Sequence, residues 1–134
     1  MNKTKIEQAI KDRLETGFKN WNGGYECWLE WCKTLYEPDC HYNIQGRRLT
    51  FEEYKGLMGK FFDAYDITMG DFHNMIIEDN WCAIRYDVIQ TNKKTGVTET
   101  VQSFEFVQFK ENPDPIGVRV VEGWALSESP IHVK

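Results

Sequence analysis

The sequence lacks several features that would point to particular classes of protein. Its 134 residues contain no run of about 18 apolar residues, so no segment is predicted to span a membrane. Basic residues are fewer than acidic ones, 16 against 21, and the net charge of −5 disfavours nucleic acid or an anionic membrane as a partner. Residues 1–15 lack the continuous apolar core of a signal peptide, so we expect a cytoplasmic protein.

Motifs for zinc, disulfides and phosphate binding are also missing. The cysteines are Cys27, Cys32, Cys40 and Cys82, and their spacing fits no zinc site. We expect all four to be reduced, and most of them to be buried as small apolar side chains. No three ligands stand at metal spacing and there is no glycine-rich phosphate loop, so we expect no metal and no cofactor.

The sequence does contain a change of hydrophobic period near its middle. Up to residue 65 the apolar residues recur mainly at helical spacing. This spacing predicts helices over residues 4–22, 25–36 and 50–65, with a short strand over 40–45. From residue 67 the period is two, which predicts strands over 67–77, 81–91, 98–110 and 118–126.

Local signals mark the ends of these elements. Thr4 and Thr50 each begin a T-x-x-E capping box, which is typical of a helix start. Gly23-Gly24 and Pro38 are expected to end the first two helices. The order α-α-β-α-β-β-β-β predicts one α+β domain over residues 1–134, with the helices packed on one face of a curved antiparallel sheet.

This order, together with two motifs, resembles the SnoaL-like, polyketide-cyclase branch of the nuclear transport factor 2-like superfamily. The first motif, HNMIIEDNWCAIRYDV from His73 to Val88, is similar to the family run H-x-x-x-x-x-x-G/D-x-x-x-A-x-R-W-x-V. The second, VVEGWALSE from Val120 to Glu128, is similar to I-V-E-H-W-D-x-x-D. The resemblance implies a cystatin-like cone with a small-molecule pocket opening toward the helices, and a homodimer formed through the sheet.

The chain departs from the family pattern at one important position. Ala125 stands where the family has an aspartate that helps run the chemistry of its cyclases and epoxide hydrolases. Arg85-x-Asp87 is similar to the R-x-D pair of the epoxide hydrolases. His41-x-Asn43 lies where those enzymes place a tyrosine and an asparagine that hold the attacking water.

Strand parity predicts which side chains share a face of the sheet, once loop lengths are chosen. With loops over residues 78–80, 92–96 and 111–117, His73 pairs with Arg85 and Arg85 pairs with Ser103. One face, the polar face, then carries Asp71, His73, Met75, Arg85, Asp87, Ser103, Glu105, Gly123 and Ala125. The other, the aromatic face, carries Phe72, Ile76, Cys82, Ile84, Tyr86, Val88, Phe104, Phe106, Val120, Trp124 and Leu126.

The two faces can be interpreted in two ways. From the strand pattern alone, the polar face would meet water and the aromatic face would pack on the helices. When the family resemblance is added, we expect the polar face to line the cavity and the aromatic face to form the homodimer.

The residues on the polar face define a candidate catalytic site. His73 is the candidate base, Arg85 would stabilise a developing oxyanion, and Asp87 or Glu105 would orient the histidine or accept a proton. The expected ligand-binding residues are His41, Asn43, Tyr54, Phe61, Phe62 and Glu105.

These residues lead to two predictions of different classes. The first is a small, mainly apolar organic ligand and a cofactor-free isomerisation, dehydration or cyclisation. The alternative, favoured by Ala125, is a non-catalytic ligand-binding or dimeric interaction module. A third possibility is a structural subunit whose aromatic face binds a different protein.

Overall fold

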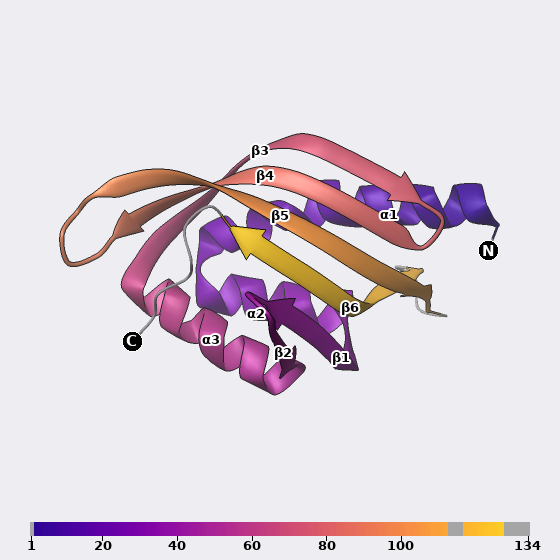
Figure 1. The fold of residues 1–134 in the computed structure, drawn as a ribbon, viewed down its shortest axis with the longest axis horizontal. Helices are drawn as coiled ribbons and strands as arrows, with labels where there is room; N and C mark the ends of the chain where they lie inside the picture. The colour runs from indigo at the N-terminus through magenta and orange to yellow at the C-terminus, as the bar shows by residue number, and fades with distance from the viewer. Residues whose placement is uncertain (1, 113–116, 128–134) are drawn as a thin grey trace.

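A computed structural model describes residues 2–112 and 117–127, and the α+β fold expected from the sequence is confirmed. The helical elements are α1 (Lys3–Gly17), the 3-10 helix η1 (Phe18–Gly23), α2 (Tyr25–Leu35) and α3 (Phe51–Ala64). The strands are β1 (Tyr36–Ile44), β2 (Arg47–Thr50), β3 (Tyr65–Glu78), β4 (Trp81–Asn92), β5 (Thr98–Glu111) and β6 (Val118–Ser127). Figure 1 shows the long strands arched over the helices.

Of the two predicted capping boxes, only the second forms. In α3 the Thr50 side chain accepts from the Glu53 backbone N–H, and the Glu53 side chain accepts from the Thr50 N–H. Helix α1 instead begins before Thr4, because the Asn2 side chain accepts a hydrogen bond from the Lys5 N–H and caps the helix there.

The strand before α3 is longer than predicted. Helix α2 ends at Leu35, and the backbone is already extended at Tyr36. Pro38 therefore lies inside β1 rather than just after a helix. A residue before proline favours extended backbone, and the pairing of β1 with β6 is irregular between Tyr36 and His41, so the missing proline N–H is tolerated.

The sheet is mixed rather than purely antiparallel. Its six strands have the order β2-β1-β6-β5-β4-β3. Strands β3 to β6 form the predicted antiparallel meander, whereas β1 pairs with β6 in parallel. The short strand β2, for which the sequence predicted no strand, pairs antiparallel with β1.

All three predicted hairpin registers are wrong: the first two by one residue, and the one between β5 and β6 by two residues at Glu105, which pairs with Ala125 rather than Gly123. Glu78 pairs with Trp81, so the turn between β3 and β4 has one residue fewer than expected. Thr91 pairs with Thr98 rather than Val97. The cause of the second error is a turn in which the Gly96 N–H donates to the Asn92 carbonyl. The Asn92 side chain also accepts from two backbone N–H groups in this turn, which adds one residue to the connection. The predicted connection over 111–117 lies partly outside the described residues.

The longer turn reverses the facing of β4 relative to β5. Glu105 is paired with Ile84, and Arg85 is paired with Phe104. We call the face that carries Ile84 and Glu105 the inner face, because its side chains meet the helices, and we call the opposite face, with Arg85, the outer face. The predicted polar face is therefore divided between the two sides of the sheet, and so is the predicted aromatic face.

The helices cover the inner face of the sheet (Figure 1). The core between the two layers is rich in aromatic side chains. Ile10, Leu14 and Phe18 are buried, so the N-terminal helical segment packs into this core. Phe18 packs at 4.6 Å from the Phe72 ring and 4.7 Å from the Tyr86 ring. None of the helices in the described part of the chain has the length and apolar composition needed to cross a membrane.

Candidate active site

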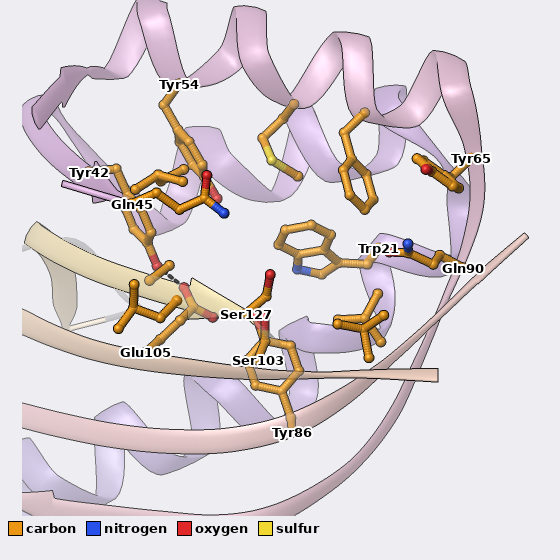
Figure 2. A pocket seen from close by; sticks show the side chains of 17 residues that line it. Trp21, Tyr42, Gln45, Tyr54, Tyr65, Tyr86, Gln90, Ser103, Glu105 and Ser127 are labelled. Atoms are coloured by element: carbon orange, nitrogen blue, oxygen red, sulfur yellow. Dashed lines mark hydrogen bonds between the residues drawn. The ribbon is translucent and has the colours of Figure 1, made fainter. Parts of the chain in front are cut away.

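A pocket lies between α3 and the inner face of the sheet, and Figure 2 shows the side chains of its 17 lining residues. Its volume is about 80 Å³. One water needs about 10–15 Å³ on this measure, so the pocket has room for a small organic molecule. The lining is mostly apolar and aromatic, with contributions from η1, β1, α3 and β3 to β6. It consists of Trp21, Tyr42, Ile44, Gln45, Tyr54, Met58, Phe61, Tyr65, Tyr86, Val88, Gln90, Val101, Ser103, Glu105, Ala125, Leu126 and Ser127.

Among the described residues of this lining, Glu105 is the one charged side chain. Its position on β5 places the carboxyl on the inner face, between tyrosines from two other strands. The Tyr42 hydroxyl donates to one carboxyl oxygen, Oε1. The Tyr86 hydroxyl donates to the other oxygen, Oε2, at 2.5 Å. Both oxygens are therefore held by neutral donors, and no cation neutralises the carboxylate within the described lining.

Burial raises the pKa of Glu105 above its ordinary value of 4.5, while the hydrogen bonds from Tyr42 and Tyr86 lower it. Desolvation is the larger effect. The pKa values of Tyr42 and Tyr86 are raised well above 10.0 by burial and then by the nearby Glu105 carboxylate. Both tyrosines thus stay protonated as donors, while the pKa of Glu105 is raised, the direction that suits a carboxyl group acting in both proton donation and proton removal.

Tyr42 is held in place by tight packing on both sides. Its ring stacks on Tyr54 at 4.5 Å with an angle of 9° between the ring planes. On β6, Gly123 faces the same ring, and a Cβ atom at this position would approach the ring to within 2.4 Å. Glycine is therefore required at 123 to leave room for the tyrosine that binds Glu105.

The raised pKa predicts how stability depends on pH. The free energy needed to ionise Glu105 is larger in the folded chain than in the unfolded one, so the Glu105 carboxyl group keeps its proton to a higher pH when the chain is folded. The Glu105 contribution to stability is thus present below pH 4.5 and is lost as pH rises through the raised folded pKa. Denaturation of Glu105→Gln and wild type over a pH series should show the variant gaining stability relative to wild type over this window. A difference that stays constant with pH would contradict the raised pKa.

Three of the residues predicted to bind a ligand line the pocket: Tyr54, Phe61 and Glu105. Phe62 lies behind the pocket wall, where its ring packs against Trp21 at 5.9 Å. His41 and Asn43 alternate with the buried Tyr42 on β1, so they lie on the outer face. There the Asn43 amide donates to Glu122 at 2.7 Å.

The predicted catalytic residues lie on the outer face, outside the pocket, and two of them are in contact. His73 Nε2 lies 2.9 Å from an Asp87 carboxylate oxygen. Arg85 is on the same outer face, where it donates to the Asn74 side chain at 2.8 Å. The expectation that these groups lie beneath α3 is wrong, because the turn at Asn92 reverses β4 relative to β5. We therefore assign them no step in the chemistry of the pocket.

The residues that surround Glu105 were not among the predicted site residues. Tyr42 was within the predicted strand over 40–45, but its facing was not assigned. Tyr86 was placed on the opposite face from Glu105 by the register error. Trp21 falls within the predicted helix over residues 4–22, and its position in the sequence did not indicate a pocket. The signal available for Tyr42 and Tyr86 was their alternation with polar neighbours on β1 and β4.

No group of three His, Cys, Asp or Glu side chains that could hold a metal occurs within residues 2–112 and 117–127. Cys32, Cys40 and Cys82 are buried, as expected, whereas Cys27 is exposed. All four are free thiols.

Comparisons with known proteins connect this architecture to solved structures. No family model and no curated protein sequence matches the chain. A SnoaL-like polyketide cyclase from Agrobacterium tumefaciens has a TM-score of 0.70 and 14% identity, over 90% of this chain and 91% of that one. A nuclear transport factor 2-like superfamily protein from Salmonella enterica has a TM-score of 0.69 and 12% identity, over 98% and 97%. AclR from Streptomyces galilaeus has a TM-score of 0.71 and 16% identity, over 95% and 91%.

These TM-scores establish a shared fold, and at such low identity they establish the fold alone. The chain has the α+β cone that SnoaL-like and nuclear transport factor 2-like proteins also have, as the two sequence motifs indicated. Fold alone does not fix an activity, because one fold supports many functions through different sites. The functional argument therefore rests on the pocket itself.

Proposed function

We propose that the chain binds a small, mainly apolar organic molecule in this pocket and catalyses a cofactor-free proton transfer on it, with Glu105 as general acid and base. The observation that carries the proposal is the Glu105 carboxyl, held between the Tyr42 and Tyr86 hydroxyls in an aromatic pocket. An isomerisation, a dehydration or a cyclisation can each begin with removal of a proton from carbon next to a carbonyl group.

The position of Glu105 relative to Ala125 supports a catalytic role. The two residues are directly paired across β5 and β6, and both line the pocket. Ala125 is the position where the family resemblance implies a functional aspartate. A carboxyl group on the neighbouring strand reaches the same region of the inner face, since paired residues in a sheet have Cβ atoms about 5 Å apart. In this chain Glu105 thus supplies the acid that position 125 lacks.

Exchange of protons with solvent tests the proposal without knowledge of the natural substrate. The probe is β-tetralone, a small aromatic ketone with acidic C–H bonds beside its carbonyl group. In heavy water, the wild-type protein is expected to exchange these protons for deuterium faster than buffer alone, as measured by NMR. Saturable binding with no exchange above buffer would favour the alternative of a non-catalytic ligand-binding module. The absence of both binding and exchange would contradict the proposed function.

A separate proposal concerns the partner that binds the outer face. We propose that it pairs with a second copy of the chain. The exposed large apolar residues Ile76, Phe104, Phe106, Trp124 and Leu126 gather on this face. Trp81 extends the patch, with its ring 5.0 Å from Phe106 and 6.0 Å from Trp124. Ile84 and Tyr86, which the sequence assigned to this surface, lie instead in the core.

Phe106→Glu is expected to turn the dimer into a monomer, because it places a charge at the centre of the apolar patch. Sedimentation velocity of the two proteins measures this change. Val97→Glu is the matched control, since Val97 is also an exposed apolar residue but lies in the turn between β4 and β5. A wild-type monomer, or a dimer that survives Phe106→Glu, would contradict the pairing and favour a different protein as the partner of this face.

A further inference from the structure

Trp21 brings an unpartnered hydrogen-bond donor to the pocket. It lies on η1, where its ring is packed against Phe18, Trp28 and Phe62. The residue is only 9% exposed, and its indole Nε1–H has no hydrogen-bond partner. A buried donor without a partner is less stable than one that is bonded, so its presence calls for an explanation.

Trp21 differs from the other tryptophans with an unpartnered indole N–H because it lines the pocket. The Nε1–H groups of Trp28 and Trp31 also lack partners, but neither residue lines the pocket. Figure 2 shows the Trp21 indole nitrogen turned into the pocket, toward the side where Ser103, Ser127 and Glu105 lie. A ligand in the pocket can therefore supply the acceptor that Trp21 lacks.

The charge of the lining limits what this acceptor can be. The 17 lining residues include one acid, Glu105, and no lysine, arginine or histidine. A carboxylate or phosphate ligand would be buried in an apolar site beside another carboxyl group, with no cation in the described lining to compensate it. An uncharged acceptor oxygen has no such penalty.

We infer that Trp21 determines ligand specificity by donating its indole N–H to the carbonyl oxygen of an uncharged ligand, whose apolar body fills the aromatic pocket. This inference rests on the proposed function, since it requires a ligand in the same pocket. It adds the chemical class of that ligand and a second polar contact, made from η1 rather than from the sheet.

The experiment compares two molecules of nearly the same shape, β-tetralone and the hydrocarbon tetralin. Each is titrated into ¹⁵N-labelled protein, and the indole N–H signals are followed by NMR. Trp21→Phe identifies the Trp21 signal by removing it, and Trp28→Phe does the same for a buried indole that is outside the pocket. In the wild type, β-tetralone is expected to move the Trp21 indole proton downfield, while tetralin does not.

Affinity provides the second measurement. Wild type is expected to bind β-tetralone about tenfold more tightly than tetralin, the effect of one hydrogen bond. Trp21→Phe should lose this preference, Trp28→Phe should keep it, and tetralin carboxylate should bind more weakly than either molecule.

The outcomes distinguish this inference from the proposed function. Equal binding of ketone and hydrocarbon, or a Trp21 signal that responds equally to both, would overturn the role of Trp21 and leave the pocket in place. The same holds if Trp21→Phe keeps the preference for the ketone. Tight binding of tetralin carboxylate would overturn the inferred ligand class. If wild type binds none of the three molecules, the proposed function fails, and the inference fails with it.

Discussion

Glu105→Gln is expected to lower the rate of deuterium exchange into β-tetralone by about 10²–10⁴-fold, the usual contribution of a positioned general acid or base. The amide has nearly the shape of the carboxyl group and can still bond the Tyr42 and Tyr86 hydroxyls. It cannot accept a proton from carbon. The loss should therefore appear in the exchange rate, while the affinity for the ketone changes much less.

Asp87→Asn is the matched control for this experiment. It makes the same chemical change at a carboxylate on the outer face, where Asp87 is 2.9 Å from His73. Exchange should continue at close to the wild-type rate, because Asp87 does not line the pocket. The reverse pattern, with exchange lost in Asp87→Asn and retained in Glu105→Gln, would return the chemistry to the residues that the sequence motif indicated.

Gly123→Ala is expected to destabilise the chain by about 1–3 kcal/mol, the typical cost of adding a methyl group to a filled core. The new Cβ atom would lie 2.4 Å from the nearest atom of the Tyr42 ring, which the stacked Tyr54 prevents from moving away. Displacing Tyr42 also removes its hydrogen bond to Glu105. Because that bond lowers the pKa of Glu105, the variant should combine a loss of stability with a further rise in this pKa.

The same substitution at Gly56 separates this crowding from the general effect of replacing glycine. Gly56 is exposed on α3, and a Cβ atom there would meet nothing within 4 Å. Gly56→Ala should therefore stabilise the chain by about 0.5–1 kcal/mol through helix propensity. Chemical denaturation of the two variants measures both effects. A Gly123→Ala variant as stable as the wild type would contradict the packing described for Tyr42.

The strands were predictable from the sequence because the period-two hydrophobic pattern of each strand extends over many residues. The predicted strand over 81–91 differs from β4 by one residue, and that over 98–110 differs from β5 by one residue. Helix α3 was equally clear, since a capping box and a broad apolar stripe agree in this segment. The resemblance to SnoaL-like proteins then indicated how the helices and the sheet are arranged.

The site was less predictable, because it depends on register, and register depends on turns. Between β5 and β6 the prediction paired Glu105 with Gly123, whereas its partner is Ala125. A displacement of two residues keeps every side chain on its own face, so this error did no harm. Between β4 and β5 the displacement was a single residue, caused by the turn that Asn92 stabilises. Because of this shift of one residue, Arg85 and Glu105 lie on opposite faces of the sheet. The predicted register had also placed Tyr86 on the face opposite Glu105, so their contact was not predicted.

The central claim is that Glu105 holds its proton to a higher pH than an ordinary glutamate, inside the pocket. Carbon-13 NMR of the side-chain carboxyl group measures this directly, with Glu105→Gln used to assign the signal. We expect the pKa of Glu105 in wild type to lie above 4.5, because burial raises it, and to rise further in Tyr86→Phe, which removes a hydrogen bond that lowers it. A pKa at or below 4.5 in wild type, unchanged in Tyr86→Phe, would contradict both the burial of this carboxyl group and its role in proton transfer.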